Sequence, residues 1–267
     1  MEYRLLPHTD LKVSRVSFGT MTLGSQADET IAARMVDQCL DAGINFFDTA
    51  NMYNKGKSEE MLGQILAGRR QNVVLASKVR HKMGEAPDDV GLSRAAIRKA
   101  AEASLRRLRT DYLDVYYLHQ PDYDVPIEET LEAMNELVGA GKVRYPAVSN
   151  YAAWQVSEIL WISEKNGFKP PYISQPMYNL LARGIEEEYL PFAKRFGVAV
   201  VPYNPLAGGL LTGKHSRDKA PPPGSRFDGS PLYRGRYWHE DYFAAVEELR
   251  SVGRTARGGY WIISLSS

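Results

Sequence analysis

Short apolar runs alternate along most of the chain with longer segments in which apolar residues recur at helical spacing. The apolar runs begin near residues 16, 44, 73, 113, 144, 172 and 198. The helical patterns cover residues 30–41, 93–108, 126–140, 152–166 and 185–196, and another is expected from residue 58. Strand and helix that alternate about every 30 residues predict βα units built around a parallel sheet.

The first strand-to-helix turn helps to choose between an open sheet and a closed barrel. An open doubly wound sheet is the competing architecture, but the signature Gly-x-Gly-x-x-Gly is missing there. We therefore predict an α/β fold, a TIM-type (β/α)8 barrel with seven clear βα units and an uncertain eighth strand. Residues 3–16 read as an N-terminal β-hairpin around a polar turn at 8–10. Barrels commonly occupy such a length undivided, so we expect residues 1–267 to form one domain.

The last part of the chain is less regular. Residues 206–238 read as a long connection rich in glycine, proline and arginine, and loops of that length usually bind something or are disordered. Residues 241–250 are helical again. Residues 261–265 are aromatic and β-branched, so we predict that they fill the eighth-strand position, with a disordered tail as the alternative.

Composition excludes several classes of partner. The formal net charge of the 267 residues is +1, so no electrostatic footprint suggests nucleic acid or an anionic membrane surface. No stretch approaches the about 18 apolar residues of a membrane span, and the N-terminus lacks the apolar run of a signal peptide. The single Cys39 lies in a helical pattern, where we expect it to be buried. These features favour a cytoplasmic protein.

Three strand ends carry polar side chains suited to catalysis. Asp48 ends the run that begins at residue 44, and Tyr53 follows five residues later. Lys78 ends the next strand-like run and His119 ends the one after that. Because the carboxyl ends of strands in a parallel barrel share one rim, these four side chains are expected to converge. Each alone has an ordinary explanation: an ion pair, loop packing or a core histidine.

Helix starts are also legible. Asp28 is a plausible cap for the helix at 30–41, and Gly43 would close that helix. After the tyrosine, Ser58 is expected to cap a second helix, because a serine hydroxyl accepts an unpaired backbone N–H. Glu59 and Glu60 in its first turn would complement the helix dipole.

These motifs resemble those of the aldo-keto reductases. The matching segments are Asp-Thr-Ala-x-x-Tyr at 48–53, Ser-Lys at 77–78 and Leu-His-Gln-Pro-Asp at 118–122, and the resemblance runs to about Glu248. Beyond that point the chain reads as divergent or truncated. The resemblance implies a barrel whose hairpin closes the bottom, and hydride transfer between NADP(H), possibly NAD(H), and a small-molecule aldehyde, ketone or alcohol.

The resemblance also implies a role for each residue at the rim. A tyrosine, whose ordinary pKa is about 10, is a poor acid at neutral pH. A neighbouring ammonium lowers that pKa, and an aspartate keeps the lysine charged and in place. Tyr53 would therefore be the proton donor, Lys78 and Asp48 would tune it, and His119 would position the carbonyl oxygen.

The cofactor residues are implied in the same way. Ser149, Asn150 and Gln175 match residues that hydrogen-bond the nicotinamide carboxamide, and Tyr203 matches the residue that stacks on its ring. The other matching positions are Gly19, Thr20, Met21, Asp48, Asn204, Pro205, Leu206, Gly208 and Leu210. No metal site is expected. The substrate is not specified, although Met21 and Trp238 suggest an apolar wall.

Two features depart from the family. Pro146 falls in the fifth strand-like run, where a proline is poorly tolerated because it lacks an N–H. Relatives bind the adenosine 2′-phosphate with Lys or Arg, Ser or Thr, and Arg after the eighth strand, and no segment here matches. Arg254 and Arg257 cannot be given that role by motif. We therefore expect weaker discrimination between NADPH and NADH than in relatives.

Two other functions remain open. The first is a catalytically impaired barrel that acts as a regulatory or binding subunit, as the β-subunits of potassium channels do in this family, or that has no function. The second is a metal-dependent hydrolase barrel. It is disfavoured because the first strand lacks a His-x-His pair and the other strand ends offer too few histidines and acids.

Overall fold

The computed structural model describes residues 1–255. The chain divides into two compact units. The first comprises residues 1–174 and 192–200, and the second comprises residues 175–191 and those from 201 onward. That residues 1–267 form one domain stays a prediction.

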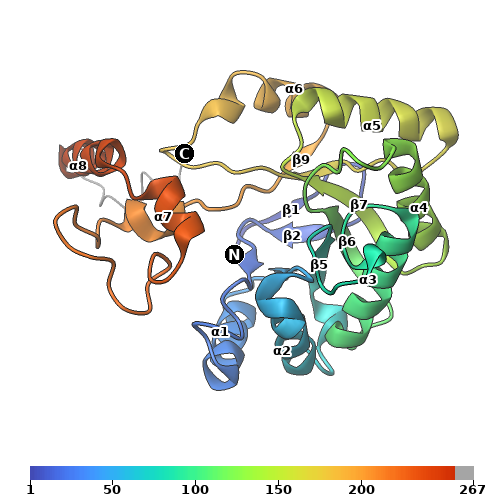
Figure 1. Ribbon diagram of the computed structural model, residues 1–267, viewed down its shortest axis with the longest axis horizontal. Helices are drawn as coiled ribbons and strands as arrows, with labels where there is room; N and C mark the ends of the chain where they lie inside the picture. The colour runs from blue at the N-terminus through green and yellow to red at the C-terminus, as the bar shows by residue number, and fades with distance from the viewer. Residues whose placement is uncertain (256–267) are drawn as a thin grey trace. The chain divides into compact units, whose positions relative to one another are not determined.

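The first unit is built on a parallel sheet that has seven strands within the described residues (Figure 1). The strands lie in the sheet in the same order as in the sequence. They are β3 (Phe18–Gly19), β4 (Phe46–Asp48), β5 (Val74–Val79), β6 (Leu113–Leu118), β7 (Val143–Ser149), β8 (Ile173–Gln175) and β9 (Ala199–Val200). All start close to their predicted positions, so the fold is an incomplete (β/α)8 barrel. The predicted eighth strand at 261–265 lies outside the described residues.

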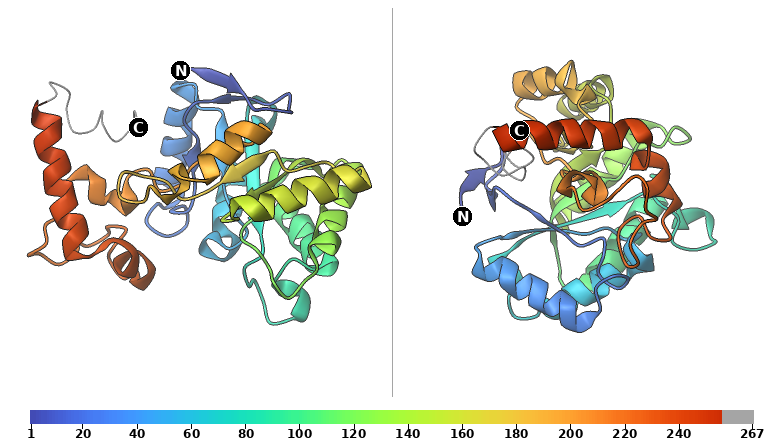
Figure 2. Two further views of the ribbon diagram at one scale, coloured as in Figure 1. Left: turned by 90° about the horizontal axis from the view of Figure 1, so that it is seen from above. Right: turned by 90° about the vertical axis from the view of Figure 1, so that its left-hand side faces the viewer.

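Helices connect successive strands and lie around the outside of the sheet, as Figures 1 and 2 show. In the first unit they are α1 (Glu29–Asp41), α2 (Lys57–Ile65), α3 (Arg94–Leu108), α4 (Ile127–Gly139) and α5 (Ala153–Asn166). Asp28 caps α1 as predicted, because its side chain accepts the Ile31 N–H at 2.9 Å. Every residue of β4, β5 and β6 is buried, as expected for central strands of a parallel sheet.

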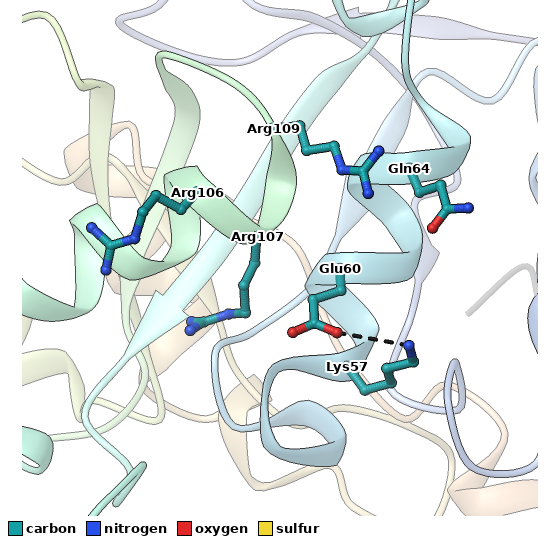
Figure 3. A pocket seen from close by; sticks show the side chains of 6 residues that line it. All are labelled: Lys57, Glu60, Gln64, Arg106, Arg107 and Arg109. Atoms are coloured by element: carbon teal, nitrogen blue, oxygen red, sulfur yellow. Dashed lines mark ion pairs between the residues drawn. The ribbon is translucent and has the colours of Figure 1, made fainter.

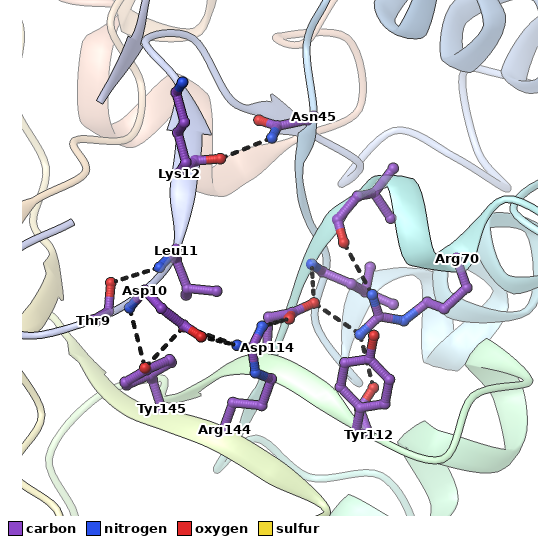
Figure 4. Close-up of polar contacts among 12 residues, drawn as sticks. Thr9, Asp10, Leu11, Lys12, Asn45, Arg70, Tyr112, Asp114, Arg144 and Tyr145 are labelled. Carbon is purple, nitrogen blue, oxygen red and sulfur yellow. Dashed lines mark hydrogen bonds and ion pairs between the residues drawn. The ribbon is translucent and has the colours of Figure 1, made fainter. Parts of the chain in front are cut away.

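The N-terminal hairpin is confirmed. Strands β1 (Tyr3–Leu5) and β2 (Lys12–Ser14) pair antiparallel. A charged network ties its turn to the sheet (Figure 4). The Arg144 guanidinium donates to Asp10 in the turn and to the buried Asp114 of β6, at 2.7–2.8 Å. Arg70 donates to the same Asp114 carboxylate at 2.8 Å. Paired in this way, a buried aspartate is stable in a sheet interior.

Strand β7 continues through Pro146, contrary to the expectation from its missing N–H. Pro146 lies opposite Tyr116 of β6, and the pairing extends on both sides of it. Registered partners before and after the proline therefore carry the strand across that position.

The second unit contains helices where the sequence predicted only a connection. The segment η5 (Ala207–Thr212) and helix α7 (Pro231–Tyr237) both fall within residues 206–238, and α8 (Glu240–Thr255) follows. Helix α6 (Tyr189–Phe196) spans the division between the units. Rings of Phe227, Trp238 and Phe243 pack edge to face with centroids 4.9–5.0 Å apart, and these contacts hold the segment together.

Two expectations from composition can be compared with the structure. Cys39 of α1 was expected to be buried, but its side chain is only half-buried, because its face of the helix is partly covered. Among residues 1–255 no helix is long and apolar enough to cross a membrane.

Close packing of α2 on α3 depends on Gly63. A Cβ atom there would lie 2.5 Å from the carbonyl carbon of Leu108 and 2.6 Å from the carbonyl oxygen of Arg107. Both are backbone atoms, so neither can rotate away. Glycine therefore sets how near the two helices come, and α2 directly follows the loop that carries Tyr53.

We predict that Gly63→Ala lowers the free energy of unfolding by about 1–3 kcal/mol, because the helices must separate to admit the methyl group. Urea denaturation measures this. The matched control is Gly139→Ala at the end of α4, where nothing lies within 4 Å of the added Cβ atom. The control should leave stability unchanged or raise it slightly, because alanine favours helix. Equal stability of the two variants would contradict the packing account.

Candidate active site

Lys78 of β5 is the centre of the predicted site, and its side chain is fully buried. Its ammonium group forms an ion pair with Asp48 and donates to the Thr49 carbonyl at 2.8 Å and to the Tyr53 hydroxyl oxygen at 3.4 Å. An ammonium has three N–H donors, so these contacts engage all of them. Strands β4 and β5 pair side by side, with Asp48 opposite Ala76, which brings the two charges together.

The loop that holds Tyr53 has an unusual backbone. In η1 (Tyr53–Gly56), residues Asn54, Lys55 and Gly56 have φ of 49°, 55° and 89°. The left-handed region costs a non-glycine residue on the order of 1–2 kcal/mol. The Asn54 amide offsets part of this cost, because it donates to two carbonyls of the loop after β3, at 3.1 and 2.6 Å.

Ser58 does not cap α2, so that prediction was wrong. The helix begins at Lys57, and Gly56 before it has no side chain to cap with. Ser58 is fully buried and donates to the Thr20 carbonyl at 2.8 Å. Its hydroxyl also lies 2.9 Å and 3.1 Å from the hydroxyls of Thr20 and Thr49. The Ser58 hydroxyl therefore links the ends of β3 and β4 and does not cap the helix.

His119 lies beside the tyrosine, as predicted. Its ring packs edge to face on Tyr53, with centroids 6.0 Å apart, and on His81, with centroids 4.8 Å apart. Its backbone N–H donates to the Val79 carbonyl at 2.9 Å, which fixes it at the end of β6. Among the described residues, no group hydrogen-bonds its buried Nδ1 atom. The structure therefore brings together all four residues predicted to be catalytic.

The charges of this site are set by burial and by neighbours. Burial alone would lower the pKa of Lys78, but the charge of Asp48 and that of Tyr53, with their hydrogen bonds, raise it above its ordinary value. Lys78 is therefore an ammonium at neutral pH. Burial, followed by the charges of Lys78 and His81, holds the pKa of His119 well below its ordinary value. His119 is therefore neutral.

Some predicted cofactor residues lie at the same rim. Ser149 is buried at the end of β7, and Asn150 follows it in a left-handed conformation with φ of 61°. The Asn150 amide donates to the His119 carbonyl at 2.9 Å and to the Ser149 hydroxyl at 3.1 Å. Both residues are thus fixed next to His119.

The first strand end has a different environment. Gly19 pairs with Asp48 in the sheet, and Thr20 donates from its N–H and its hydroxyl to the Asp48 carbonyl at 2.9 and 3.1 Å. Thr20 is fully buried, and Met21 accepts from Asn54 through its carbonyl. These contacts tie the first strand end to the tyrosine loop.

The remaining cofactor positions belong to the second unit. Tyr203 donates its N–H to the Pro176 carbonyl at 3.0 Å. Asn204 has a φ of 62°, and its side chain contacts the hydroxyls of Tyr233 and Tyr237 at 3.3–3.4 Å. The other positions in this unit are Gln175, Pro205, Leu206, Gly208 and Leu210. Each unit thus carries a separate part of the predicted cofactor set.

Gly208 is required by its surroundings. Its φ is 69°, and a Cβ atom there would lie 2.7 Å from the Tyr233 ring. Gly209 next to it has a φ of 106°, and a Cβ atom there would lie 3.9 Å from the Lys214 ammonium nitrogen. Successive glycines with positive φ beside an amine form a surface suited to phosphate.

The structural roles of three residues in or next to the candidate site were not predicted from the sequence. Asn54 fixes the tyrosine loop, His81 packs on His119, and Glu59 is fully buried. The signal for Asn54 was available, because asparagine tolerates the left-handed region and precedes a glycine by two positions. Burial of Glu59 depends on a partner far along the chain, which a local pattern does not reveal.

We predict that stability falls in acid partly because of His119. The unfolded chain takes up this proton near pH 6.5, its ordinary pKa, whereas folded His119 resists protonation. The unfolded state then binds more protons below about pH 6.5, and the free energy of unfolding decreases there by up to about 1.4 kcal/mol per pH unit. Above about pH 6.5 His119 is neutral in both states, so it does not lower the free energy of unfolding there.

Urea denaturation at several pH values measures this effect in the parent and in His119→Gln. The variant should lose less stability than the parent between about pH 7 and pH 5. The control is His239→Gln, which replaces an exposed histidine side chain of the second unit. Parallel pH profiles for the parent and His119→Gln would contradict the assignment.

Comparison with known proteins bears on this geometry. A sequence model described as the Aldo/keto reductase family matches residues 15–265, past the position where the motifs predict that the resemblance ends. The chain is 39% identical over 226 residues to a probable voltage-gated potassium channel subunit beta from Oryza sativa subsp. japonica, with 83% of this chain and 69% of that protein covered.

Two further proteins are similar to it. An aflatoxin B1 aldehyde reductase member 2 from Rattus norvegicus is 38% identical over 248 residues, covering 90% of this chain and 66% of that protein. The holo form of an aldo-keto reductase from Bacillus halodurans superimposes with a TM-score of 0.77 at 36% identity, covering 99% of this chain and 81% of that one. These matches support an oxidoreductase and imply a nicotinamide cofactor. With the family model matching nearly the whole length, the chain belongs to the aldo/keto reductase family.

Proposed function

We propose that the protein reduces the carbonyl group of a small-molecule aldehyde or ketone with NADPH, and runs the reverse reaction with NADP⁺. The observation that carries this proposal is the 3.4 Å contact between the buried Lys78 ammonium and the Tyr53 hydroxyl oxygen. A phenol and an ammonium in this arrangement are suited to proton transfer at a carbonyl oxygen.

The direction of that hydrogen bond matters for the chemistry. An ammonium has no acceptor, so the Tyr53 oxygen accepts from Lys78 and its own hydrogen points elsewhere. When that proton leaves for the carbonyl oxygen, the phenolate stays next to a positive charge, which stabilises it. Asp48 keeps the buried ammonium paired, so the charge is present before the substrate arrives.

His119 completes the group that faces the substrate. Its low pKa keeps the imidazole neutral, so one ring nitrogen carries a hydrogen that it can donate. A donor next to the Tyr53 ring would hold the carbonyl oxygen in position for the phenol proton. We assign His119 to orientation and Tyr53 to proton transfer.

The residues present fit a nicotinamide cofactor. Ser149 and Asn150, fixed beside His119, would hold the carboxamide in the first unit. Within the second unit taken by itself, the Gly208–Gly209 turn beside the Lys214 ammonium suits a phosphate group. The bound cofactor supplies the hydride, and the protein supplies placement and electrostatic stabilisation. NADP(H) is our proposed form, and NAD(H) is the alternative that a fluorescence titration with each nucleotide distinguishes.

A regulatory or binding subunit is the second candidate function. Likeness to a protein described as a potassium channel subunit favours it. The intact group of Asp48, Tyr53, Lys78 and His119 favours the enzyme, because a purely structural subunit does not need a buried ammonium next to a phenol. For the proposed reductase we also propose a cytoplasmic location without nucleic-acid or membrane partners, supported by the net charge of +1.

We predict that Tyr53→Phe lowers kcat for aldehyde reduction by about two to four powers of ten, because the proton donor is lost while the ring is retained. Nucleotide affinity should stay within about threefold of the parent, since less than 1 kcal/mol of binding is involved. Steady-state kinetics and nucleotide titration measure both quantities.

Tyr3→Phe is the matched control. It removes a phenol hydroxyl from the N-terminal hairpin, where that group donates to the Gly43 carbonyl. The control should retain the parent kcat. A Tyr53→Phe variant that keeps a tenth of the parent rate would refute the role of Tyr53. A parent protein that binds nucleotide but reduces no carbonyl would favour the regulatory subunit.

A further inference from the structure

Glu59 is a buried carboxylate that the proposed mechanism leaves unused. It lies in the first turn of α2, and its exposed fraction is 0%. Burying a carboxylate is unfavourable unless both oxygens are paired. Ser77 donates its hydroxyl to Glu59 Oε1, and Arg107 of α3 donates its Nε hydrogen to Glu59 Oε2 at 2.7 Å.

These partners place Glu59 between the two elements that must be aligned for proton transfer. Helix α2 directly follows the loop that begins at Tyr53. Ser77 directly precedes Lys78 in β5 and is also fully buried. The Glu59 carboxylate therefore joins the segment that carries the phenol to the strand that carries the ammonium.

Arg107 supports the tyrosine loop at a second point. A Cβ atom on Gly56 would lie 2.8 Å from the Arg107 Cδ atom and 2.9 Å from its Nε atom, so the side chain lies directly against that backbone. Gly56 is the last of the three left-handed residues after Tyr53. Such a backbone conformation persists only where its surroundings hold it in place.

The contact that depends on this alignment is sensitive to small movements. The Lys78–Tyr53 distance of 3.4 Å is at the long end of hydrogen-bond lengths. A shift of the loop by about 1 Å would break it, and misplacements of that size can lower rates by about 100-fold.

We propose that Glu59, together with Arg107, is a positioning residue that holds the Tyr53 loop against Lys78. This inference rests on the proposed function, because it concerns the same phenol and ammonium. Neither residue touches the reacting atoms. They act through α2 and β5, as two ends of one buried ion pair.

The surroundings of Arg107 supply a matched control. Arg107 extends from the end of α3 toward α2 and lines a surface pocket of about 390 Å³ (Figure 3). Arg106 and Arg109 line the same pocket, and neither contacts Glu59 among the interactions of the described residues. Arg106→Ala therefore removes a neighbouring positive charge without removing the proposed support.

The test compares Glu59→Gln, Arg107→Gln and the double variant with the parent and with Arg106→Ala. Glutamine keeps the shape of Glu59 but removes its negative charge, and its single side-chain oxygen can accept from only one of the two partners, Ser77 or Arg107. We expect kcat to fall about 10- to 100-fold in Glu59→Gln, with KM and nucleotide affinity little changed. The solvent deuterium isotope effect on kcat should rise, because proton transfer from a displaced phenol becomes slower.

The double variant separates a shared role from two independent ones. If the two residues act as one pair, the double variant loses no more activity than the worse single variant. Arg106→Ala should match the parent in kcat and isotope effect. Unchanged kcat in a folded Glu59→Gln variant would overturn the proposal. So would equal losses of nucleotide affinity and activity, which indicate a general structural role.

Two further measurements test the proposal even if Glu59→Gln folds poorly or the parent protein has no activity. Ser77→Ala removes only a hydroxyl, so it should fold, and we expect a several-fold lower kcat. A normal kcat in Ser77→Ala, combined with an unfolded Glu59→Gln, would overturn the proposal. Crystal structures of the parent and Glu59→Gln need no activity: the Tyr53–Lys78 distance should exceed hydrogen-bond range in the variant alone. An unchanged distance refutes positioning, whereas an inactive parent refutes only the proposed function.

Discussion

The ion pair between Asp48 and Lys78 is the interaction on which the rest of the site depends. A fully buried ammonium is stable only with an opposite charge, and removing one partner of such a pair costs about 3–5 kcal/mol. The pair exists because β4 and β5 are neighbours in a parallel sheet and end at the same rim. Lys78 then has one donor left for Tyr53, and the proposed chemistry depends on that contact.

The surrounding structure keeps this pair and the phenol in register. Gly63 lets α2 approach α3 closely, and this packing brings Arg107 within reach of Glu59. At the other end of the sheet, Asp114 is held by Arg70 and Arg144, and Arg144 also donates to Asp10 in the turn of the N-terminal hairpin. Each of these buried acids is paired with arginine from a different element. The sheet therefore carries charged groups inside without leaving any of these acids unpaired.

Much of the fold was predictable because its signals are local. Apolar runs and helical spacing placed all seven described strands, and the rim rule brought Asp48, Tyr53, Lys78 and His119 together. The cap at Ser58 failed because its hydroxyl is used by Thr20 and Thr49, two partners that only the folded chain brings near. The burial of Glu59 was not predicted for the same reason, since its partner Arg107 lies far along the chain. Residues 206–238 were misjudged because glycine and proline obscured two short helical segments.

The central claim is that the buried charge pair enables Tyr53 to give its proton. The double variant Asp48→Asn/Lys78→Met tests it most directly, because it removes both charges and leaves neither one unpaired in the interior. The measurement is kcat for aldehyde reduction, with circular dichroism to verify the fold. We expect a folded protein whose kcat is lower by at least about two powers of ten. A folded double variant within tenfold of the parent would contradict the account.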